Sequence, residues 1–142
     1  MLIFLRRQFT DYTQFANKWV KKYLYFFIHV PPEEGLERFG AYRAWAIELA
    51  AALREHGIRT FPEVPHIATF LAYAPGTAEQ VNERVVALVE ERGVVPCGLW
   101  SEADVPGWVQ TELTCYEAAV TRDPGEVAAV VAEAVGAATF LP

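Results

Sequence analysis

The first part of the chain carries apolar side chains at helical spacing. Between Thr10 and Phe27 they recur in steps of three and four: Tyr12, Phe15, Ala16, Trp19, Val20, Tyr23 and Phe27. This pattern predicts a helix with an aromatic stripe. We expect it to end near Pro31 and Pro32, because proline lacks the N–H that continues a helix and restricts the residue before it. The stripe needs a cover, either from this chain or from a partner.

The remainder of the chain alternates helix and strand signals with short connections. Helical periodicity or end signals mark three segments: Leu36 to Glu55, the stretch from the capping box Thr77–Gln80 to Gly93, and the stretch that follows Asp123. Strand signals mark four segments: Ile58 to Phe61, His66 to Tyr73, Val94 to Leu99, and Trp108 to Cys115. The stretch from Ser101 to Gly107 is expected to be a loop. The second of these strands is apolar on both faces and should therefore lie inside the sheet.

The resulting order of elements predicts an α/β (α+β) fold. We expect a small antiparallel or mixed sheet of about four strands with helices on one face, preceded by the aromatic helix. The other face of the sheet would be open. We divide the chain into an N-terminal aromatic, basic helical segment, residues 1–32, and a second domain, residues 33–142.

Charge is distributed unevenly along the chain. Residues 1–30 carry five Lys or Arg and one Asp, a balance of +4, whereas residues 31–142 carry seven Lys or Arg and seventeen Asp or Glu, a balance of −10. The acidic part argues against a nucleic-acid partner, since phosphate binding needs clustered cations. The longest apolar run is far below the roughly 20 residues that span a bilayer, and no secretory signal is evident. We therefore expect a soluble, cytoplasmic protein with no membrane partner.

Few side chains suggest chemistry. The histidines and the two cysteines, Cys97 and Cys115, lack the spacing of a metal site, and we expect both thiols to be reduced and buried. The stretch from Trp108 to Cys115 alternates, placing Val109, Thr111, Leu113 and Cys115 on one face and Trp108, Gln110, Glu112 and Thr114 on the other. A solvated strand explains the second face adequately. A site is the alternative, because an exposed tryptophan usually contacts something.

Four stretches together resemble a known family. They are Phe39 to Leu53, Pro62 to Pro65, the strand through Phe70, and Pro106 to Cys115. In this order they resemble the C-terminal small domain of the threonine aldolase and aromatic amino-acid β-eliminating lyase family. The resemblance covers roughly residues 36–137. It implies a pyridoxal-phosphate enzyme of the aspartate-aminotransferase-like fold, acting in amino-acid metabolism.

The resemblance also implies what this chain lacks. In the family a large domain supplies the Schiff-base lysine, and the small domain closes over the substrate. The lysines here, Lys18, Lys21 and Lys22, do not stand in a matching context, and neutral Gln110 stands near the position where many members carry an arginine for the substrate carboxylate. We assign no catalytic residue and no metal ligand. Trp108, Gln110 and Glu112 are the candidates for facing a substrate.

Two functions follow from these observations. The first is a partial threonine-aldolase-like lyase, either truncated or one half of a split enzyme. It would bind pyridoxal phosphate and catalyse only with a large-domain partner chain. The second is a noncatalytic interaction or dimerisation module, in which the aromatic N-terminal helix forms a homo-oligomer or docks a partner.

Overall fold

A computed structural model describes residues 32–93, 95 and 97–136 of the chain. The chain divides into two compact units, Met1–Arg38 and Phe39–Pro142. The predicted aromatic helix, Thr10 to Phe27, lies outside the described residues. The proposed division between residues 32 and 33 remains a prediction.

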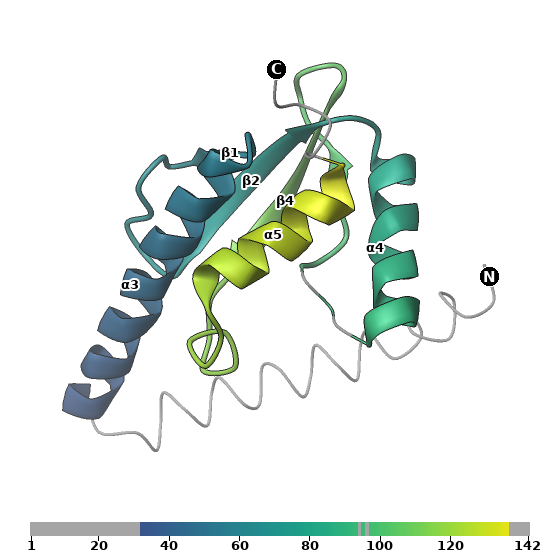
Figure 1. The fold of residues 1–142 in the computed structure, drawn as a ribbon. Helices are drawn as coiled ribbons and strands as arrows, with labels where there is room; N and C mark the ends of the chain where they lie inside the picture. The colour runs from purple at the N-terminus through teal and green to yellow at the C-terminus, as the bar shows by residue number, and fades with distance from the viewer. Residues whose placement is uncertain (1–31, 94, 96, 137–142) are drawn as a thin grey trace, which may run out of the picture. The chain divides into compact units, whose positions relative to one another are not determined.

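The described elements follow the predicted order of helices and strands. They are α3 (Pro32–Glu55), β1 (Arg59–Phe61), β2 (Thr69–Pro75), α4 (Ala78–Arg92), β3 (Ser101–Glu102), β4 (Trp108–Thr114) and α5 (Pro124–Val135). Figure 1 shows α5 running across the strands, with α3 and α4 on either side of it.

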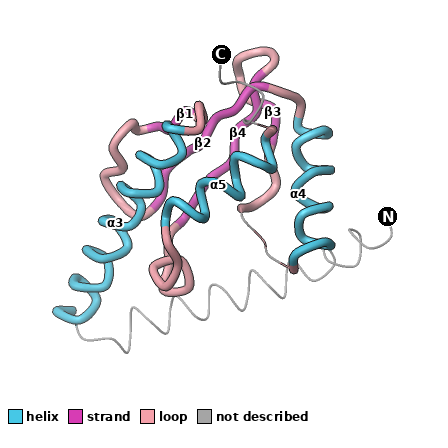
Figure 2. The backbone as a smooth tube through the Cα atoms, in the orientation of Figure 1, coloured by secondary structure: helices cyan, strands magenta, loops and turns pink. Residues whose placement is uncertain are grey.

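The strands form one open sheet with the order β1-β2-β4-β3, in which every neighbouring pair is antiparallel. Strand β2 therefore lies inside the sheet, as its two apolar faces predict. The tube drawing in Figure 2 shows the same arrangement of helices and strands. An α/β fold with a small antiparallel sheet is confirmed.

The predicted helix ends are present at both short helices. The side chain of Thr77 accepts a hydrogen bond from the N–H of Gln80 at the start of α4, and Gly93 ends this helix in the left-handed conformation with φ of 65°. At α5 the Asp123 carboxylate accepts from the N–H of Glu126 at 2.9 Å, and a proline follows in the first turn. These contacts satisfy N–H groups that have no partner inside the helix.

The core lies between the helices and one face of the sheet. On β4 its residues include Val109 and Leu113, which alternation assigned to the helix side, and on β2 they include Ala72 and Ala74. Large side chains from the helices complete it, among them Leu53 at 0 % exposure. Packing of these apolar surfaces is the main contribution to the stability of the fold.

One predicted strand is wrong. The described residues between 94 and 99 are not in a strand, and the ladder with β4 begins instead at Ser101–Glu102, inside the expected loop. A side chain explains the difference, because Asn82 of α4 bonds both backbone groups of Trp100. Its Oδ1 accepts from the Trp100 N–H at 2.8 Å and its Nδ2 donates to the Trp100 carbonyl at 2.9 Å. These two hydrogen bonds hold the backbone of Trp100 against α4.

Candidate functional site

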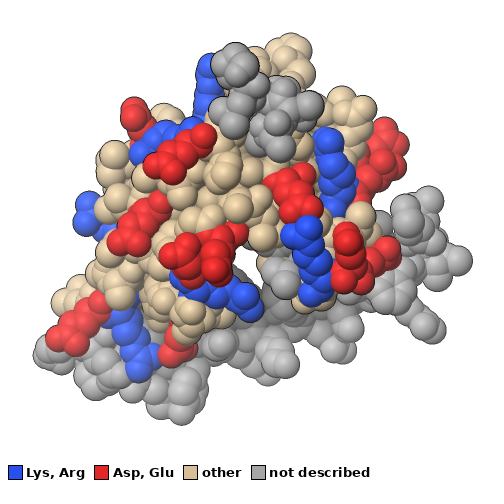
Figure 3. Space-filling view, in the orientation of Figure 1, with Lys and Arg blue, Asp and Glu red and all other residues tan. Residues whose placement is uncertain are grey.

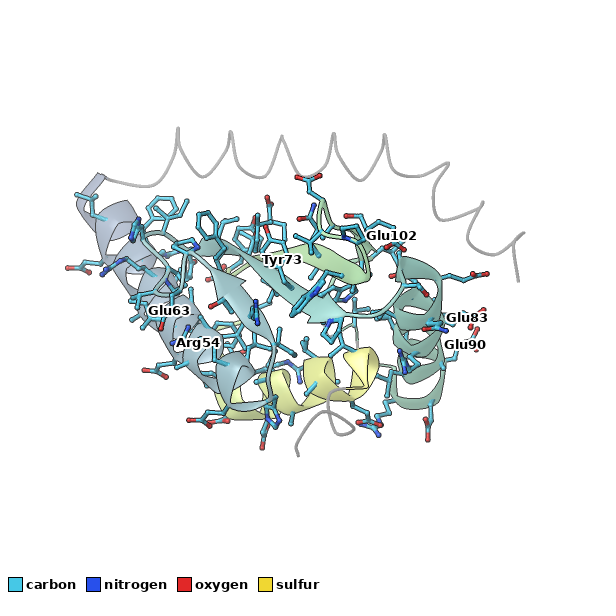
Figure 4. All side chains as sticks on the ribbon, turned by 90° about the horizontal axis from the view of Figure 1, so that it is seen from above. Arg54, Glu63, Tyr73, Glu83, Glu90 and Glu102 are labelled. Carbon is cyan, nitrogen blue, oxygen red and sulfur yellow. The ribbon has the colours of Figure 1, made fainter. Side chains whose placement is uncertain are left out.

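The face of the sheet away from the core, here called the open face, carries a row of polar and aromatic side chains. Antiparallel register places Arg59 opposite Tyr73, Tyr73 opposite Gln110, and Gln110 opposite Ser101. Directly paired residues project to the same side of a sheet. In Figure 4 helix α5 lies on the other side of the strands.

The three residues predicted to face a substrate lie on this open face. Trp108 and Gln110 are half-buried, and Glu112 is exposed. Trp108 and Glu112 are four residues apart on one extended strand, which separates their Cα atoms by about 13 Å. The three side chains therefore share a face without converging on one point. Their role as substrate-facing residues remains a prediction.

Sequence reasoning missed Arg59, which the structure brings to Trp108. The guanidinium carbon of Arg59 lies 4.7 Å from the centroid of the Trp108 ring, within the range of a cation–π contact. Arg59 belongs to β1 and Trp108 to β4, with β2 between these strands. Alternation around the buried Ile58 signals that Arg59 points away from the core. No pattern in the sequence predicts that the Arg59 side chain reaches across β2 to Trp108.

The other face of β4 is buried and carries no reactive side chain. Thr111 is 5 % exposed, and its hydroxyl donates to the Leu99 carbonyl at 3.1 Å. The thiols of Cys97 and Cys115 are free and buried, as expected. Burial raises the pKa of Cys97 to about 11, against a smaller opposing effect of its hydrogen bond with Trp100, and raises the pKa of Cys115 to about 12. Thiols of this kind are poor nucleophiles, because the thiolate is the reactive form.

The connection between β1 and β2 is held by arginines from α3. Arg54 donates to the Thr60 hydroxyl at 3.0 Å and to the Glu63 carbonyl, and Figure 4 shows Arg54 beside Glu63. Arg43 donates to the backbone carbonyl of His66 at 3.1 Å. The predicted strand therefore starts at Thr69 and not at His66, because the preceding residues are held against α3. His66 itself is exposed.

The opposite edge of the sheet is tied to α4 by a carboxylate. Glu102 of β3 accepts from the N–H of Ala78 at 2.7 Å, which places a negative charge at the N-terminus of α4. This is a structural cap. Among the residues that the structure describes, no group of three or more His, Cys, Asp or Glu side chains is placed to hold a metal ion.

Surface charge does not form a basic patch on the side seen in Figure 3. Acidic and basic side chains are interspersed over the helix-covered side of the sheet. One exposed pair joins Arg92 of α4 to Glu133 of α5, with a shortest N–O distance of 2.6 Å. Within the described part of the chain, no helix is long and apolar enough to span a bilayer.

Comparisons with known proteins give two structural neighbours. No protein-family model and no curated protein matches the sequence. One neighbour, from Exiguobacterium sp. 255-15, is a proposed aromatic amino acid beta-eliminating lyase/threonine aldolase. Its TM-score is 0.58 at 28% identity, over 70% of this chain and 28% of the neighbour. The other, a proposed L-allo-threonine aldolase from Listeria monocytogenes EGD-E, has a TM-score of 0.53 at 23% identity, over 66% of this chain and 26% of that one.

The resemblance seen in the sequence agrees with this result. At 23% identity the Listeria protein supports the fold alone, whereas the Exiguobacterium protein is similar in both fold and sequence. This chain matches only about a quarter of the length of either neighbour. The chain is structurally similar to part of the threonine aldolase and aromatic amino acid beta-eliminating lyase structures, consistent with a fragment of that family.

Proposed function

We propose that this chain is the small-domain part of a threonine-aldolase-like lyase that works only when a second chain supplies the cofactor domain. The supporting observation is the uneven coverage: 70% of this chain matches 28% of the Exiguobacterium protein. The remainder of the Exiguobacterium protein lies outside the match. The family that the chain resembles places its Schiff-base lysine in the large domain.

The described residues do not fit pyridoxal phosphate by themselves. No lysine follows Lys22, so residues 32–136 offer no amine for a Schiff base. Among the described residues, no buried side-chain nitrogen or oxygen lacks a hydrogen-bond partner, so the interior offers no unpaired group for the cofactor phosphate. When a partner holds it, the cofactor supplies the electron sink for cleaving a β-hydroxy amino acid.

In this proposal the open face is the side turned toward the partner's site. Its half-buried Trp108 ring would exclude water, and its Gln110 amide would donate or accept hydrogen bonds. The helix-covered face would take no part in the partner's site, because its apolar side chains already pack in the core. The alternative function, a dimerisation module built on the aromatic helix, concerns residues outside the described part of the chain.

A covalent chimera tests whether this domain can serve as a small domain. Residues 33–142 replace the matched part of the Exiguobacterium protein. The intact protein and its large domain without any graft are the positive and negative controls. The proposal predicts that the chimera shows aldimine absorbance and cleaves L-allo-threonine above the ungrafted large domain. A folded chimera with aldimine absorbance but no gain in cleavage, beside an active intact protein, would contradict the proposal.

A further inference from the structure

The open face carries large apolar and aromatic side chains that lie outside the core. Leu71, Tyr73 and Trp108 are half-buried, and Phe61 at the end of β1 is 66 % exposed. The register places Phe61 directly opposite Leu71, so both side chains lie on the open face with Tyr73. None of these four side chains belongs to the core of the described residues. We call them the apolar patch, and a surface of this kind marks an interaction site.

Two exposed side chains of opposite charge flank the centre of the apolar patch. Arg59 of β1 lies opposite Tyr73, and Glu112 of β4 lies opposite Leu71, in the next row along the strands. The two charged residues are two strands and one row apart, which separates their Cα atoms by about 12 Å. The midpoint between them falls on β2, between Leu71 and Tyr73. The open face therefore has an apolar centre with a cation on one side and an anion on the other.

We propose that a second copy of this chain covers the open face, with the two sheets packed face to face about a two-fold axis. In such an interface the same surface meets itself, so residue i contacts residue j and j contacts i. A rotation that brings Arg59 of one copy to Glu112 of the other therefore forms the reverse pair as well. Its axis passes between Leu71 and Tyr73, which brings the apolar patches of the two copies together. Sheets packed in this way lie about 10 Å apart.

The charges of the face favour a second copy over a partner of another kind. A self-complementary surface needs both signs of charge at equal distances from its centre, and Arg59 and Glu112 meet that requirement. A partner surface of a single sign would be repelled by one of the two. Aromatic residues and arginine are enriched in protein–protein interfaces and lysine is depleted there, and none of the four strands contains a lysine.

This dimer goes beyond the proposed function and does not depend on it. The cofactor-domain partner of the proposed function would use the same face. The second copy would therefore cover the open face in the chain alone and would leave it before that partner binds. Because β1 and β3 contain only three and two residues, the face is small, which suits a reversible dimer.

Sedimentation velocity of the full 142-residue chain over a wide range of concentrations tests the dimer. We expect a reversible change from the mass of one chain to that of two. Arg59→Glu and Glu112→Arg each place two pairs of like charges across the interface and should weaken association by at least about tenfold. Mixing the two variants restores both pairs of opposite charge. The mixture should therefore associate at concentrations where each variant alone stays monomeric.

Two control variants separate this interface from other routes to association. Arg92→Glu reverses the same charge in an exposed pair on α4, away from the open face, and should leave the dimer unchanged. Trp19→Ala alters the predicted aromatic helix, which lies outside the described residues, and should also leave the dimer unchanged. Circular dichroism shows whether each variant is folded.

Several outcomes would overturn the dimer. They are a chain that stays monomeric at every concentration, a dimer that persists in both folded open-face variants, and a dimer that only Trp19→Ala abolishes. Monomeric variants whose mixture also stays monomeric would overturn the pairing of Arg59 with Glu112. A monomeric chain beside an active chimera would remove the dimer alone. A dimer restored by mixing beside an inactive chimera would remove only the proposed function.

Discussion

Replacing two adjacent residues of β2 with lysine, one at a time, tests the two-sided sheet. Ala72 is 0 % exposed and faces the helices, whereas its neighbour Leu71 is half-buried on the open face, opposite Glu112. Ala72→Lys places an ammonium group among apolar side chains. Leu71→Lys places the same group where water or the Glu112 carboxylate can receive it.

The expected costs differ by several kcal/mol. Burying an unpaired lysine lowers its pKa by about 3–5 units, which at 1.36 kcal/mol per unit is about 4–7 kcal/mol. Overpacking a core position adds about 1–3 kcal/mol. The sum rivals the whole stability of a small domain, about 5–15 kcal/mol. Leu71→Lys forfeits the burial of about half a leucine, about 1 kcal/mol, and regains part of it from a cross-strand pair with Glu112.

Urea unfolding monitored by circular dichroism distinguishes the two variants. We expect Ala72→Lys to be unfolded, or to unfold at a far lower urea concentration than the unsubstituted chain. Leu71→Lys should stay within about 1 kcal/mol of the unsubstituted chain with an unchanged slope. Equal destabilisation by both substitutions would refute the assignment of the two faces.

Three further predictions follow from individual contacts. Asp123→Ala removes the N-cap of α5 and should cost about 1 kcal/mol of unfolding free energy in urea. Trp45→Phe removes the 2.8 Å hydrogen bond from the indole N–H to the Arg122 carbonyl and should lower the free energy of unfolding by about 1–2 kcal/mol in the same assay. Phe61→Leu, at an exposed position, is the control. At pH 8 the thiols should react with iodoacetamide more slowly in the folded chain than in urea, by about 100-fold at Cys97 and about 1,000-fold at Cys115. Equal rates in the two conditions would contradict their burial.

The same thiols predict the sign of a pH dependence. Burial raises their pKa values from the ordinary 9.0 of a cysteine thiol to about 11 for Cys97 and about 12 for Cys115. Above pH 9 the unfolded state therefore binds fewer protons than the folded state, and the free energy of unfolding falls as pH rises from about 9 toward these values. Urea midpoints measured on either side of pH 9 in Cys97→Ala and in the unsubstituted chain check this prediction. A decline of equal size in Cys97→Ala and in the unsubstituted chain would show that Cys97 does not cause the pH dependence.

The sequence predicts those parts of the fold that depend on local chemistry. Alternation from Trp108 to Cys115 predicted the buried face of β4, and the caps Thr77 and Asp123 predicted where α4 and α5 begin. These features are encoded by residues within a few positions of one another. The strand expected from Val94 to Leu99 was predicted wrongly because a residue distant in the sequence intervenes. Asn82, on α4, forms hydrogen bonds with both backbone groups of Trp100.

The candidate site was only partly predictable. The shared face of Trp108, Gln110 and Glu112 follows from alternation within one strand. Arg59 could not be added to it, because its contact with Trp108 depends on β2 lying between β1 and β4. Strand order is a long-range property of the fold, and a single sequence carries no local signal for it.

The most direct test of the central claim uses the chain alone. The purified protein is mixed with pyridoxal phosphate and L-allo-threonine, reduced with borohydride, and analysed by peptide mass spectrometry, with acetaldehyde measured in a parallel unreduced sample. The account predicts no specific adduct and no acetaldehyde, because in the proposed function a second chain supplies the Schiff-base lysine. A stoichiometric adduct on Lys18, Lys21 or Lys22, together with turnover, would contradict it and show that this chain is an enzyme by itself.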